Sequence, residues 1–169
     1  AQHRTVDAVV AALQAAGASV ERSTATSAAE ARTQSAEAAR SGKYDALLAA
    51  GGDGTVRQVA AAAAGTSCPV APIMLGTGNV LAHELALPRK PAGIARMILE
   101  GPEVEIEMGL ANGEPFLLMA GAGFDGRVIA ALDHRWKQRL WKLAYVPPVL
   151  RALAAPADRL TVTCDGKRR

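Results

Sequence analysis

Residues 47–60, LLAAGGDGTVRQVA, run from an apolar stretch through glycines grouped around Asp53 and into a helical pattern. The apolar part, which starts at Tyr44 as YDALLAA, is typical of a buried strand. The run TVRQVAAAAAG, residues 55–65, predicts a helix that stops at Gly65. A strand, a glycine loop and a helix in this order indicate a parallel α/β sheet, so this stretch decides the fold class.

The neighbouring segments repeat the alternation of helix and strand. Ser27, followed three residues later by Glu30, has the pattern of a helix N-cap. Because a parallel connection needs a long crossover, the alternation predicts parallel strands joined by helices. The predicted helices cover residues 5–16, 27–42, 80–87 and 91–101, and the further predicted strands cover residues 18–23 (ASVERS) and 68–75 (CPVAPIML).

The pattern changes after Gly101, where apolar and charged residues begin to alternate with a period of two. Asn112-Gly113 is a strong signal for a hairpin turn. Strands are expected over residues 104–110 (VEIEMGL) and 115–124 (PFLLMAGAGF), and 159–169 (RLTVTCDGKRR) is predicted as a strand and a turn that ends before its partner. We therefore expect an α/β domain over residues 1–103 and the start of an antiparallel β domain over residues 104–169.

Two glycine-rich loops, GGDGT and GTGN, each follow a predicted strand and precede a predicted helix. Loops at the carboxyl ends of parallel strands line the ligand crevice of an open sheet. Glycines let backbone N–H groups approach an anion, and a helix N-terminus adds partial positive charge. Hydroxyl and amide side chains add hydrogen-bonding groups. The predicted phosphate site comprises Gly51, Gly52, Gly54 and Thr55 of the first loop and Gly76, Thr77, Gly78 and Asn79 of the second.

Asp53 lies in the first loop, where a carboxylate would repel phosphate oxygens. Either Mg²⁺ bridges the carboxylate and the phosphate, or the carboxylate accepts the proton of an attacking hydroxyl during phosphoryl transfer. The alternative is a tight turn in which Asp53 caps a helix. GAGFDG, residues 121–126, offers a further acid, Asp125, which is suited to binding a substrate hydroxyl beside Phe124; the alternative for this segment is a turn at the end of a strand.

Composition and motifs exclude several other classes of protein. The net charge of +3 over 169 residues is too small to indicate nucleic-acid binding. Cys68 and Cys164 lie far apart, so neither a disulfide framework nor a zinc site is indicated, and a cytoplasmic location is expected. No run reaches the roughly 18 apolar residues of a membrane-spanning helix. The P-loop pattern is absent, and no GxGxxG opens an early helix.

GGDGT at 51–55, LGTGN at 75–79 followed by Ala82, and GAGFDG at 121–126 resemble, in order and spacing, the diacylglycerol kinase catalytic domain family. This family includes bacterial lipid kinases and sphingosine and ceramide kinases. The resemblance implies an α/β nucleotide domain, related to that of NAD kinases, followed by an antiparallel β-sandwich that is incomplete here. It also implies ATP and Mg²⁺ as cofactors, with ATP bound by the two glycine loops, Asp53 serving catalysis and Asp125 facing the lipid acceptor.

Some positions depart from the family pattern. Many members have Asn-Glu where this chain has Arg57 and Gln58, and many have Asp where it has Val80. The usual first strand, with its Asn-Pro element, does not precede Ala1, and the late acidic element of the sandwich would lie beyond Arg169. We therefore expect a fragment that is inactive by itself, with metal ligands that the sequence does not identify.

HRWKQRLWKLAYVPPVL, residues 134–150, sets Trp136 and two leucines along one face of a predicted basic helix that ends at Pro147 and Pro148. Such a helix could lie at a membrane surface, or pack on its own domain with a solvated basic rim. The leading prediction is an ATP- and Mg²⁺-dependent kinase that phosphorylates the hydroxyl of diacylglycerol or a related lipid. The alternatives are an NAD kinase-like enzyme and a nucleotide-binding regulator without catalytic activity.

Overall fold

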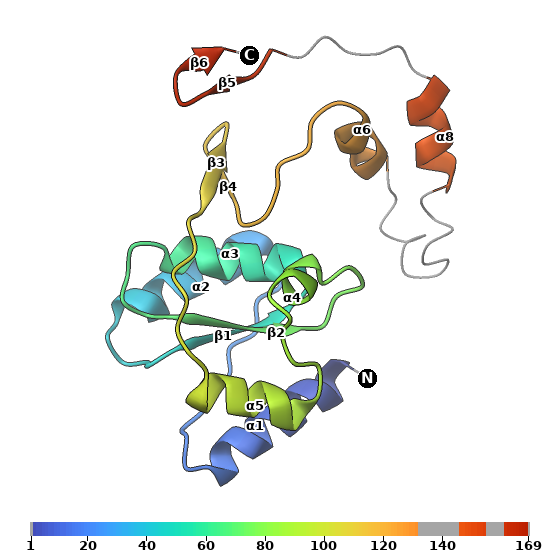
Figure 1. Cartoon of the computed structure of the whole chain (residues 1–169). Coiled ribbons are helices and arrows are strands. Elements are labelled where there is room, and N and C mark those ends of the chain that lie inside the picture. The colour runs from blue at the N-terminus through green and yellow to red at the C-terminus, as the bar shows by residue number, and fades with distance from the viewer. Residues whose placement is uncertain (1, 132–145, 155–160, 169) are drawn as a thin grey trace. The chain divides into compact units, whose positions relative to one another are not determined.

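The computed structural model describes residues 2–131, 146–154 and 161–168, and divides into two compact units, Ala1–Leu118 and Met119–Arg169 (Figure 1). The second unit contains α6 (Phe124–Ala130), α8 (Val146–Ala154), β5 (Thr163–Cys164) and β6 (Lys167–Arg168). The first contains α1 (Gln2–Ala15), α2 (Ala28–Arg40), β1 (Leu47–Gly51), α3 (Asp53–Ala63), β2 (Val70–Met74), α4 (Val80–Glu84), α5 (Pro91–Glu100), β3 (Gly109–Ala111) and β4 (Glu114–Phe116).

The centre of the first unit is a parallel pair of strands, β1 and β2. Their register runs from Leu47 opposite Val70 to Gly51 opposite Met74. Helix α3 makes the crossover between them, as the alternation of elements predicts. The predicted parallel α/β fold is confirmed in this unit.

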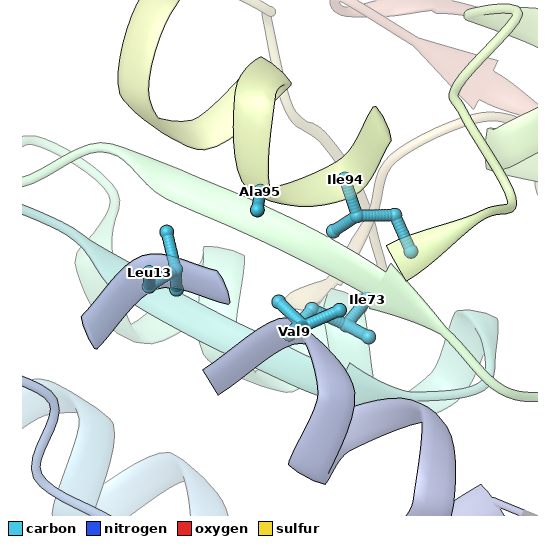
Figure 2. Close-up of a cluster of buried hydrophobic side chains, with 5 residues drawn as sticks. All are labelled: Val9, Leu13, Ile73, Ile94 and Ala95. Atoms are coloured by element: carbon cyan, nitrogen blue, oxygen red, sulfur yellow. The ribbon is translucent and has the colours of Figure 1, made fainter. Parts of the chain in front are cut away.

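Helices cover both faces of this strand pair. Side chains alternate between the faces of a strand, so Ile73 faces α1 and α5 whereas Ala49 packs with α3. Figure 2 shows the first of these contacts, in which Val9 and Leu13 of α1 approach Ile73 of β2 and the α5 side chains. Helices α2 and α3 cover the opposite face (Figure 1). Both faces of the strand pair are thereby covered by packed helices.

Helix α2 begins as the sequence predicts. The Ser27 hydroxyl accepts a hydrogen bond from the Glu30 N–H at 3.1 Å. The Glu30 carboxylate in turn accepts hydrogen bonds from the N–H and the hydroxyl of Thr26, both at 2.7 Å. These hydrogen bonds to Thr26 hold the pKa of Glu30 below its ordinary value. The negative charge also lies in the first turn of α2, where the helix dipole favours it.

Glu30→Gln is expected to destabilise the protein more at pH 7 than in acid. Because folding lowers the pKa of Glu30, its stabilising effect is present above pH 4.5, the ordinary value, and is lost as the pH falls through the folded-state pKa. Urea unfolding at pH 7 and in acid would measure the difference. Glu37→Gln on the same helix is the control, since Glu37 has no hydrogen-bond partner in the described structure. An equal loss at both pH values for Glu30→Gln would contradict the expectation.

Several predicted elements differ in the structure. Residues 18–23 form no strand, although Ala18 and Val20 pack against the core. The hairpin turn at Asn112-Gly113 is confirmed by positive φ angles of 52° and 82°, but its strands are only three residues long. The helix predicted over 80–87 is reduced to α4. A strand needs a hydrogen-bonded neighbour, and the shortened or missing strands have none over their predicted lengths.

Two predictions for the second unit are corrected by the structure. GAGFDG does not end a strand; α6 begins at Phe124, after Gly123 with φ 79°. The segment near the end has its partner, because β5 and β6 pair antiparallel around Asp165-Gly166. Pro147 and Pro148 lie in the first turn of α8, a position where the missing proline N–H costs nothing. The predicted helix containing Trp136 lies outside the described residues.

The antiparallel pairs in the described residues are the two hairpins, β3–β4 and β5–β6. Contacts place the first hairpin in the same unit as the α/β layers. The expected boundary near residue 103 and the β-sandwich therefore stay predictions. Within the described ranges, no helix is long and apolar enough to cross a membrane.

Candidate functional site

The two glycine loops meet at the carboxyl edge of the parallel strands. The Leu75 N–H donates to the Gly51 carbonyl at 2.7 Å, so the two loops leave their strands side by side. Gly52 and Gly76 then touch through their backbones. A Cβ atom on Gly76 would lie 2.7 Å from the Gly52 Cα and 2.8 Å from Asn79 Oδ1. Because a real Cβ does not approach so closely, this contact requires glycine at position 76.

Asp53 connects the two loops. It is the first residue of α3 and is half-buried, and its Oδ1 accepts a hydrogen bond from the Leu81 N–H at 3.2 Å. Its Oδ2 lies beside Gly78, where an added Cβ would be 3.4 Å away. The N-cap of α3 is Gly52, with no side-chain capping bond. The carboxylate therefore does not cap its own helix, but lies across the second loop at the first turn of α4.

Asn79 is the residue of the second loop with the most unusual backbone. It has φ 48° and ψ 46°, the left-handed region that asparagine tolerates better than most residues, and it is the N-cap of α4. Its Oδ1 atom is buried without a hydrogen-bond partner. An orphaned buried polar atom is costly unless something binds it. Its position next to Gly76 makes the second loop a candidate ligand contact.

A phosphate group fits this arrangement. The first N–H groups of α3 have no carbonyl partners inside the helix and follow a loop in which two glycines leave room. Thr55 and Thr77 are exposed, so their hydroxyls are accessible. Mg²⁺ on a nucleotide is usually held by one or two carboxylates together with phosphate oxygens, and this site supplies the carboxylate of Asp53. Among the described residues, no cluster of three or more His, Cys, Asp or Glu side chains forms a metal site by itself.

Arg57, one of the departures from the family pattern, lies one helical turn after Asp53. Its Nη1 donates to the Pro115 carbonyl of β4 at 3.2 Å, and its side chain is half-buried. In the sequence, this position stands out only because many family members have asparagine there. The contact joins residues 58 positions apart, so no local pattern could have revealed it.

Asp125 belongs to the second unit and lies in the first turn of α6. The distance between Asp125 and the glycine loops is therefore not defined by the structure. Val80 is the first residue of α4 and is 44% exposed. It leaves the start of α4 without the carboxylate that many family members carry there.

Two other reactive side chains of the first unit, Cys68 and Tyr44, have structural partners. Cys68 is buried, and burial, together with the charge of Asp45, raises the pKa of its thiol. The Tyr44 hydroxyl donates to Glu21 Oε2 at 2.6 Å, and this hydrogen bond raises the pKa of the tyrosine. Neither group has the lowered pKa of an activated nucleophile. The glycine loops remain the candidate site.

The sequence model of the diacylglycerol kinase catalytic domain matches residues 1–111, which contain both glycine loops and Asp53. The chain belongs to this family. Proteins named probable lipid kinase YegS-like are among its relatives. The one from Pseudomonas aeruginosa is 38% identical over 112 residues, which cover 65% of this chain and 37% of that protein. The one from Cronobacter sakazakii is 34% identical over 122 residues, covering 69% and 41%.

A further relative is the uncharacterized protein sll0036 of Synechocystis, 36% identical over 100 residues, covering 59% of this chain and 23% of that protein. The chain thus spans between 23% and 41% of the length of these three relatives. No solved structure matches the chain significantly. The family implies ATP and typically a divalent metal as cofactors.

Proposed function

We propose that the protein containing this chain is an ATP- and Mg²⁺-dependent kinase that phosphorylates a lipid hydroxyl. One observation carries the proposal: the two glycine loops are in backbone contact, and the carboxylate of Asp53 in the first loop accepts the Leu81 N–H that follows the second. Phosphoryl transfer depends mainly on positioning and charge neutralisation, which backbone N–H groups and one acid can supply. The names of the lipid kinase relatives support the class of acceptor.

In this proposal each loop has a separate task. Gly51, Gly52, Gly54 and Thr55 contact the phosphates from the N-terminus of α3, and Gly76–Asn79 contact ATP from the second loop. Asp53 accepts the proton of the lipid hydroxyl as its oxygen attacks the γ-phosphorus and the bond to ADP breaks. Bound Mg²⁺ would neutralise charge on the phosphates.

The lipid side of the site is proposed to involve the second unit. Asp125 would face the acceptor, and a β-sandwich to which residues 104–169 contribute would enclose the lipid. A cytoplasmic protein that touches the membrane surface only peripherally is consistent with a lipid acceptor. The basic residues after Arg127 would then favour anionic headgroups, at about 1 kcal/mol for each base near the surface.

The test is an assay of the full-length protein with ATP and Mg²⁺ against three acceptors: diacylglycerol, a sphingoid base and NAD. Phosphorylation of a lipid, with none of NAD, is the expected result. Phosphorylation of NAD alone would replace the proposal with the NAD kinase-like alternative. ATP binding without any phosphorylated product would instead support a non-catalytic regulator. An Asp53→Asn preparation, purified in parallel, controls for contaminating kinases.

A further inference from the structure

Arg57 and Asp53 lie on the same face of α3. Residues four apart in a helix are stacked one turn above the other, so the Arg57 side chain leaves α3 one turn after the carboxylate. Its Nη1 donates to the Pro115 carbonyl at 3.2 Å. The hairpin β3–β4 is therefore attached to the face of α3 that begins with Asp53, and Figure 1 shows the hairpin beside this helix.

The geometry of the hairpin explains why the Pro115 carbonyl needs an outside donor. Pro115 pairs with Leu110 across the hairpin and has no N–H, so this pair is not one that exchanges hydrogen bonds across an antiparallel ladder. Its carbonyl instead points away from β3, toward α3. Pro115 is itself buried, and a buried carbonyl without a donor is unfavourable. The guanidinium of Arg57 supplies that donor.

The hairpin also contacts the packing that supports Asp53. Leu117, which follows β4, packs against the core cluster that contains Val56 and Leu81. Leu81 is the residue whose N–H holds the Asp53 carboxylate. The Phe116 ring covers Gly109 on the facing strand, so that a Cβ at position 109 would overlap the ring. The attachment by Arg57 and the packing of Leu117 thus both connect the hairpin to the candidate site, whereas Leu110 stays 71% exposed on the opposite strand.

We propose that Arg57 is a positioning residue that fixes hairpin β3–β4 against the face of α3 that begins with Asp53, and that the hairpin so held borders the path of the acceptor hydroxyl. The role toward the acceptor rests on the proposed function, whereas the attachment of the hairpin by Arg57 does not. In the proposed function ATP is contacted by the glycine loops, and the hairpin contributes no residue to these contacts. Arg57 consequently affects the acceptor and the catalytic step, not the binding of the nucleotide.

The test compares Arg57→Met and Arg57→Lys in the full-length protein, with diacylglycerol in mixed micelles as acceptor. Methionine keeps the apolar stem without a donor, and lysine keeps a charge and a donor. Arg57→Met is expected to lower kcat/KM for diacylglycerol at least about tenfold while the Kd for ATP changes by less than about twofold. Amide exchange at residues 114, 116 and 117 should accelerate, and Arg57→Lys should restore part of both effects.

The matched control is Arg40→Met, because Arg40 also donates to a backbone carbonyl, that of Ala36, but at an exposed position and within its own helix. It should leave kinetics and hairpin exchange unchanged. Unchanged diacylglycerol kinetics in Arg57→Met, or equal losses for ATP and lipid with a lower Tm, would overturn the proposal. If the wild-type protein phosphorylates no lipid, the proposed function fails. Amide exchange at residues 114, 116 and 117 then tests the attachment by itself, and the absence of faster exchange in Arg57→Met would overturn it.

Discussion

Asp53→Asn in the full-length protein is expected to reduce lipid phosphorylation by about 10²- to 10⁴-fold, the usual contribution of a general base. The amide oxygen can still accept the Leu81 N–H bond, which measures 3.2 Å in the structure, so the contact between the two loops is kept. What the variant loses is the charge and the ability to take a proton. The kcat measured at saturating ATP and lipid would report this loss.

The affinity for ATP separates a catalytic role from a structural one. When binding is measured without Mg²⁺, removing the negative charge beside the phosphates should leave the Kd for ATP unchanged or lower it, since carboxylate and phosphate repel each other. Asp45→Asn, at an exposed position before β1, is the control and should retain activity. Near-normal turnover in Asp53→Asn would show that Asp53 is not the general base. If turnover is lost, a cooperative unfolding transition would show that the variant is still folded.

The meeting of the two glycine loops could be predicted from the sequence. Each loop follows an apolar run of strand length, and parallel neighbours bring such loops to one edge. The structure agrees, because Gly51 lies opposite Met74 in the register and Gly52 touches Gly76. The start of α2 was equally predictable, since the Ser27 and Glu30 contacts are local.

Contacts between distant segments could not be predicted in this way. The hydrogen bonds from Leu81 to Asp53 and from Arg57 to Pro115 join residues 28 and 58 positions apart, and no periodicity encodes them. Residues 18–23 have the composition of a strand, yet a strand forms only where a neighbour accepts its hydrogen bonds. In GAGFDG, glycine favours a turn and a helix start equally, and the positive φ of Gly123 leads into α6.

Gly76→Ala is expected to weaken ATP binding by forcing the loops apart. The new methyl group would lie 2.7 Å from the Gly52 Cα, which is backbone and cannot rotate away, and 2.8 Å from Asn79 Oδ1. Overpacking of this kind costs about 1–3 kcal/mol, and if the closed arrangement of the loops bears the full cost, ATP affinity falls by about 5- to 150-fold. Isothermal titration of the full-length protein with ATP and Mg²⁺ would measure the change.

Gly54→Ala tests whether the effect of replacing a loop glycine on stability depends on the room for a Cβ atom at that position. An added Cβ at Gly54 meets nothing within 4 Å, and Gly54 lies inside α3. Alanine there should raise the free energy of unfolding by about 0.5–1 kcal/mol, since it loses less backbone entropy on folding than glycine does. Gly76→Ala should lower it in the same urea titration. Equal stabilities for the two variants would mean that the loops can separate at no cost. The contact between Gly52 and Gly76 would then not hold Asp53 beside the second loop.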